Sequence, residues 1–144
     1  MYGSRCRIGV LVPPGNPTVE PEMYRMAPAG VTIHFARFDP ADDMREPGGA
    51  EGLEERTRAM LTGLAAPARA LAAVKPAVVV LAHTGVSYVN GFANEQALID
   101  RLTSLAGDVS PGDVMLTAAA ELRAHGRREA ALETAARAAS WFRG

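Results

Sequence analysis

The sequence predicts one α/β domain, a parallel sheet with helices on both of its faces. Three runs, RIGVLV (7–12), VTIHFARF (31–38) and VVVL (78–81), are apolar and rich in β-branched residues, as in strands buried on both sides. Segments with helical apolar spacing follow these runs, so strands and helices alternate along the chain. Because this order requires right-handed crossovers between parallel strands, we expect three layers and a sheet of four or five strands.

The first predicted strand ends in the turn PPGNPT (13–18), whose prolines cannot donate hydrogen bonds to a sheet. Asn16 or Thr18 can cap the helix that follows, and Pro17 suits its first position. A helix that begins after a parallel strand is a ready site for an anion. The alternative is that the turn only connects the two elements.

A long second helix is predicted before the third strand, and Pro67 is expected to kink or break it because proline lacks an N–H. Its apolar stripe consists of Leu53, Met60, Leu61, Leu64, Leu71 and Val74. A third helix is expected over Asn94–Leu105, with Gly107 as its C-cap. Beyond it, Val114–Leu116 is a candidate fourth strand, and the alanine content of residues 127–144 favours helix.

The length, net charge and cysteine content limit the classes of protein to which this chain can belong. A chain of 144 residues is long enough to bury the core of one domain. The net charge of −1 argues against nucleic acid or an anionic membrane as a partner, and no apolar run approaches the roughly 18–20 residues of a membrane span. A single cysteine, Cys6, allows no internal disulfide, so we expect a cytoplasmic protein.

The segment after the central strand carries most of the candidate chemistry. His83, Thr84, Gly85 and Ser87 are expected in a loop dense in hydrogen-bonding groups. In open α/β sheets, ligands bind beyond the carboxyl ends of the strands, so this loop and the Asn16 turn should form one site. His83 is a general base or a carboxylate-binding group, or else a structural histidine. No G-x-G-x-x-G follows the first strand, which argues against a dinucleotide cofactor.

The connection over residues 39–52 is rich in acidic residues, proline and glycine, and we expect it to act as a flap over the same edge of the sheet. Its acids Asp39, Asp42 and Asp43 have no histidine or cysteine nearby in the sequence. We therefore expect no metal site there.

Two motifs taken together resemble a known family. RIGVLVPPGNPTVEPE (7–22) and VVVLAHTGVSYVNG (78–91) are similar to the aspartate/glutamate racemase superfamily, and in particular to its maleate isomerase and arylmalonate decarboxylase branch. The resemblance covers residues 7–134 and implies one of the two flavodoxin-like halves of a cofactor-independent enzyme. It also implies a last strand over residues 130–134, which leaves residues 135–144 as a divergent helical tail.

The resemblance assigns roles to particular residues. Asn16 falls where maleate isomerases hold a substrate carboxylate, and His83 stands where many relatives have their first catalytic cysteine. The loop after His83 would bind a carboxylate and stabilise an enediolate-like anion with its hydroxyl and N–H groups. The substrate-binding residues implied in this way are Pro14, Gly15, Asn16, Thr84, Gly85 and Ser87.

Three functions remain open at this point. The first is an isomerase, decarboxylase or racemase that acts on a small carboxylate or dicarboxylate, with no cofactor or metal. Because the second half and its cysteine are absent from the sequence, a second subunit would have to complete that site in a homodimer, with Trp141 and Phe142 as interface anchors. The second is a non-catalytic protein that binds a small carboxylate or a protein partner, and the third is a truncated relic.

Overall fold

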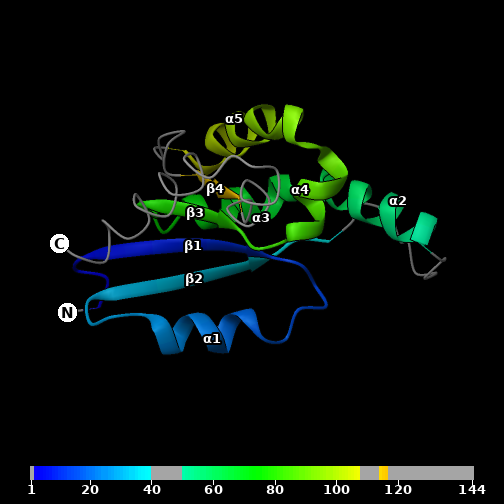
Figure 1. Cartoon of the computed structure of the whole chain (residues 1–144). Helices are drawn as coiled ribbons and strands as arrows, with labels where there is room; N and C mark the ends of the chain where they lie inside the picture. The colour runs from blue at the N-terminus through cyan, green and yellow to red at the C-terminus, as the bar shows by residue number, and fades with distance from the viewer. Residues whose placement is uncertain (1, 40–49, 108–113, 117–144) are drawn as a thin grey trace.

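A computed structural model describes residues 2–39, 50–107 and 114–116. The chain has the α/β fold that the sequence predicts (Figure 1). Its elements are β1 (Cys6–Val12), α1 (Val19–Met26), β2 (Val31–Arg37), α2 (Ala50–Met60), the 3-10 turn η1 (Thr62–Leu64), α3 (Ala65–Ala72), β3 (Val78–Leu81), α4 (Thr84–Asn90), the 3-10 turn η2 (Phe92–Asn94), α5 (Glu95–Ala106) and β4 (Val114–Leu116).

The strands form a parallel sheet in the order β2-β1-β3-β4. In the register of this sheet, Val10 on β1 pairs with Phe35 on one side and with Val80 on the other. The strands β1 and β3 are therefore adjacent and central, and β2 lies at one edge of the sheet. The chain leaves β1 toward β2 and later returns to the other side of β1, so a topological switch point lies between β1 and β3.

Helices lie on both faces of the sheet (Figure 1). Alternate residues of each strand point to opposite faces, so Val10 packs in the cluster beside α1, whereas Leu11 packs in the cluster beside α3 and α5. Both side chains are completely buried. This explains why the strand sequences are apolar without alternation, since each strand has a core on both sides.

The predicted long second helix is broken into α2, η1 and α3, as Pro67 suggests. Pro67 lies in the first turn of α3, where the missing N–H has no intrahelical partner to lose. Gly63 lies at the break, and a Cβ atom on it would overlap the backbone carbonyl of Asp39. The segment after β2 and the α2–α3 junction therefore meet at a contact that only glycine permits.

The prediction of a loop over Thr84–Gly91 is wrong, because helix α4 begins directly at Thr84. Its composition favours a turn, but Val86 is completely buried in the core, and this tertiary contact outweighs the weak helix propensity of the segment. A smaller correction concerns α1. This helix begins at Val19 rather than at Pro17.

Several predictions lie outside the described residues. They are the flap over most of residues 39–52, the strand over 130–134, the tail 135–144 and the anchors Trp141 and Phe142. In the part of the chain that the structure describes, no helix has both the length and the apolar character needed to cross a membrane.

The contact at Gly63 gives a first prediction. Gly63→Ala should lower the free energy of unfolding by about 2 kcal/mol or more, because the added methyl group must displace the Asp39 backbone. Gly52→Ala is the matched control, since Gly52 lies in α2 with open space around it, and it should raise stability by about 0.5–1 kcal/mol. Urea unfolding of both variants checks this, and equal effects would contradict the assigned contact.

Candidate functional site

A cleft of about 600 Å³ lies at the carboxyl ends of β1 and β3, where the topology places a ligand site. Its walls come from the β1–α1 turn, from Asp39, which lies shortly after β2, from one face of α2, and from His83, which lies shortly after β3. The lining residues are Pro13, Pro14, Gly15, Asn16, Pro17, Thr18, Asp39, Arg56, Thr57, Met60 and His83. The cleft therefore combines apolar proline and methionine surface with a few polar groups.

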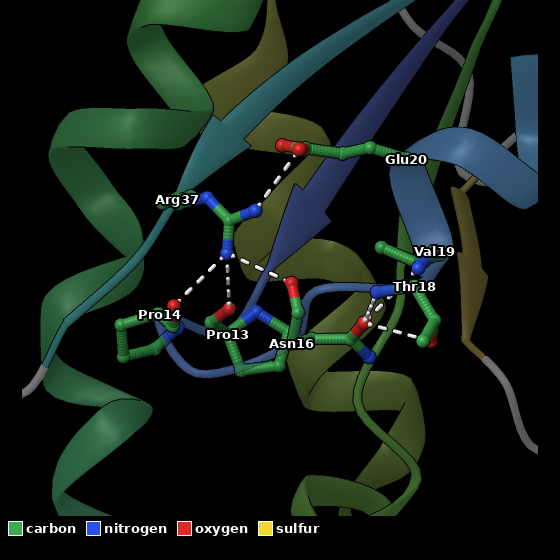
Figure 2. A network of polar contacts seen from close by, with 7 residues as sticks. All are labelled: Pro13, Pro14, Asn16, Thr18, Val19, Glu20 and Arg37. Atoms are coloured by element: carbon green, nitrogen blue, oxygen red, sulfur yellow. Dashed lines mark hydrogen bonds and ion pairs between the residues drawn. The ribbon is translucent and has the colours of Figure 1, made fainter.

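The Asn16 side chain organises the turn that forms one wall. Its Oδ1 accepts hydrogen bonds from the backbone N–H of Thr18 at 2.9 Å and of Val19 at 3.0 Å, and from the Thr18 hydroxyl at 3.2 Å (Figure 2). These bonds satisfy backbone donors at the start of α1, which have no partner within the helix. The amide oxygen is therefore committed to the protein. The amide nitrogen has no hydrogen-bond partner among the described contacts, and Asn16 is one of the residues that line the cleft.

Arg37, at the end of β2, holds the same turn from outside (Figure 2). Its Nη1 donates to the backbone carbonyls of Pro13 at 3.1 Å, Pro14 at 3.0 Å and Asn16 at 3.1 Å. Its Nη2 forms an ion pair with Glu20 at 3.0 Å. Glu20 thus points at Arg37 and is not among the residues that line the cleft.

His83 follows β3, and its ring is held by contacts on several sides. Nδ1 accepts a hydrogen bond from the backbone N–H of Val86 at 3.3 Å. The ring lies 6.1 Å from the ring of Phe38, between centroids, and a Cβ on Gly85 would come within 2.8 Å of its Cε1. Burial lowers the pKa of His83, and a hydrogen bond with its own backbone acts more weakly in the opposite direction.

Helix α2 supplies residues that sequence reasoning missed. Arg56, Thr57 and Met60 line the cleft, and Thr57 is buried. A signal for them was present, since they lie three, four and seven positions after Leu53 on the inward side of the predicted helix. Arg56 and Asp39 are the charged side chains among the lining residues, and no ion pair joins them among the described contacts.

The structure brings together only part of the predicted site. Pro14, Gly15, Asn16 and His83 line one cleft, although they come from segments almost 70 positions apart. Thr84 and Gly85 begin α4 beside this cleft and are not among its lining residues. Ser87 also lies on α4. Over the described residues, no group of three or more histidine, cysteine or acidic side chains is placed to hold a metal ion.

No family model matches the sequence, and no curated protein matches it. The cleft must therefore be interpreted from its own chemistry. Its polar groups are one guanidinium, one carboxylate, one imidazole, two threonines and one amide, set against apolar walls.

The Arg37 contacts generate a second prediction. Arg37→Met should lower the free energy of unfolding by about 1.5–3 kcal/mol, because it removes a charged donor from three backbone carbonyls. Glu20→Gln should cost less than about 1 kcal/mol, since it removes only a partly exposed ion pair. Chemical unfolding of both variants measures the difference. Equal losses would mean that the ion pair, not the carbonyl contacts, is the larger effect.

A third prediction concerns the pH dependence of stability. Because the pKa of His83 is lowered in the folded state, the unfolded chain binds a proton more readily as the pH falls below about 6.5. The stability that depends on neutral His83 is therefore complete above that pH and is lost as the pH falls through the folded-state pKa. His83→Asn should flatten this part of the stability curve, as measured by thermal unfolding from pH 7.5 to 5. Parallel curves would contradict the prediction.

Proposed function

We propose that the cleft binds a small carboxylate. The observation that carries this proposal is the convergence of three donor groups, the Asn16 amide, the Arg56 guanidinium and the His83 imidazole, on one cleft. Guanidinium and N–H donors are the usual partners of carboxylates in proteins. Apolar surface from the prolines of the turn and from Met60 would cover the remainder of a small organic acid.

We infer further that the fold is flavodoxin-like and that the chain is related to the aspartate/glutamate racemase superfamily. The strand order β2-β1-β3-β4 supports this, because it matches the first four strands of the flavodoxin-like order. The cleft lies at the β1/β3 switch point, where that fold binds its ligands. The Asn16 motif and the His83 motif, which carry the family resemblance, both contribute to the cleft.

The reaction proposed is a cofactor-independent isomerisation, decarboxylation or racemisation. In such reactions negative charge develops on the carboxylate as an enediolate-like anion, and fixed donors stabilise it. A second subunit is proposed to close the cleft and supply the group on the other side of the substrate, as in the two-half enzymes. A non-catalytic carboxylate-binding protein is the alternative, and it predicts binding without turnover.

The fourth prediction tests the site with calorimetric titration of monocarboxylates, dicarboxylates and α-amino acids, paired with a turnover assay. Arg56→Gln should weaken carboxylate binding about ten-fold or more, because one charged hydrogen bond is lost. Asn16→Asp should weaken it at least as much, since a carboxylate oxygen replaces the donor nitrogen. The aspartate keeps an oxygen for the N–H groups of Thr18 and Val19, so α1 should remain capped and the fold intact.

Asp39→Asn is the control of opposite sign. Asp39 is the acid that lines the cleft, so its neutralisation should strengthen the binding of a dicarboxylate more than that of a monocarboxylate. Turnover that rises with protein concentration as a dimer forms would support the second subunit. If no carboxylate binds to the wild-type protein, the proposed function is wrong.

A further inference from the structure

His83 has two ring nitrogens, and the structure commits them differently. The backbone N–H of Val86 donates to Nδ1 at 3.3 Å and also to the His83 carbonyl at 3.1 Å, and the residue lines the cleft. A neutral imidazole carries its proton on one nitrogen and a lone pair on the other. A lone pair on Nδ1 that accepts from Val86 requires the proton of a neutral ring to be on Nε2.

We propose that His83 acts in the cleft as a neutral hydrogen-bond donor through Nε2–H, and that Gly85 is the positioning residue that allows it. This inference rests on the proposed carboxylate site and specifies how His83 serves it. A general base at Nε2 would need the other tautomer, whose Nδ1–H would face the Val86 N–H. An imidazolium would place two donors against each other in the same way.

The surroundings of the ring favour the neutral state. Phe38 packs near one side of it, and Val86 and Thr57 beside it are buried. Arg56 and Asp39, which carry opposite charges, also line the cleft. The backbone of His83 itself also favours protonation, but burial has the larger effect. A neutral imidazole can still stabilise an oxyanion, because its N–H remains a directed donor as charge develops.

Gly85 explains why the ring can reach Val86. A Cβ at this position would lie 2.8 Å from Cε1 and 3.2 Å from Nδ1 of His83, so any side chain must push the ring away. Gly85 has no positive φ, so a substitution tests space and not backbone conformation. The family resemblance placed Gly85 among the substrate-binding residues, whereas its contact here is with the histidine ring.

The experiment reads the tautomer directly. Nitrogen-15 NMR of the histidine rings of the ligand-free protein at pH 7 should show His83 with Nδ1 unprotonated and Nε2 protonated. His83→Asn identifies the signals of this residue. Gly85→Ala should change this pattern, whereas Gly15→Ala, which adds a methyl group into open space on the same cleft, should leave it unchanged. An Nδ1–H tautomer or an imidazolium at pH 7 would overturn the inference.

Two substitutions of His83 test the donor itself. Asn keeps an oxygen near the position of Nδ1 and removes the Nε2 donor, whereas Gln places an amide N–H near Nε2 and gives up the Nδ1 acceptor. If His83 donates, Asn should weaken carboxylate binding about ten-fold or more, and Gln should weaken it much less. Equal loss of turnover in both variants, with binding unchanged, would identify a base and overturn the donor role.

The experiments distinguish a failure of the carboxylate site from a failure of the inference about His83. If the tautomer is Nε2–H but the wild-type protein binds no carboxylate, the proposed function is wrong and the donor has no ligand to serve. If carboxylates bind and the ring is an Nδ1–H tautomer, the site stands and the inference about His83 falls.

Discussion

Three backbone carbonyls of the turn after β1 point at one guanidinium, and the position of the cleft wall depends on that contact. The turn leaves the sheet at Pro13, so its carbonyl groups have no strand partner, and Arg37 satisfies three of them. Arg37 pairs with Val12 in the β1–β2 register, and the next residue, Phe38, donates its N–H to the Val12 carbonyl. The pairing of two core strands therefore sets where Asn16 lies.

This dependence on register explains which parts of the molecule the sequence could predict. The strands were predictable because each is apolar on both faces, and their order followed from the βαβ pattern. The contacts of Arg37 with the turn could not be predicted, because a single arginine at the end of a strand has no distinctive spacing. Its partners are also backbone groups of another segment. Contacts of this kind depend on tertiary structure and leave no periodic signal in the sequence.

The candidate site, like the fold, could be predicted from the sequence only in part. Asn16 and His83 follow strands that the sequence identifies, so the carboxyl edge of a parallel sheet brings them together. The helix at Thr84 was missed because glycine, serine and asparagine favour turns, while the buried side chain that holds the helix, Val86, looks like any other apolar residue. Arg56 was missed because an arginine on an amphipathic helix is ordinarily part of its solvated face.

Asn16 and His83 have a structural feature in common that Arg56 lacks. Each has two polar atoms on a rigid planar group, and in each the acceptor atom is bound to a backbone N–H: Oδ1 of Asn16 at the start of α1, and Nδ1 of His83 at the start of α4. Fixing the acceptor also fixes the direction of the donor on the same group, so the proposed binding of a carboxylate would need little reorganisation of either side chain. Among the described residues no hydrogen bond or ion pair holds Arg56, so it would contribute charge to the cleft without a fixed direction. In the proposed carboxylate site, attraction would come from helix α2, and orientation would come from the ends of the two central strands.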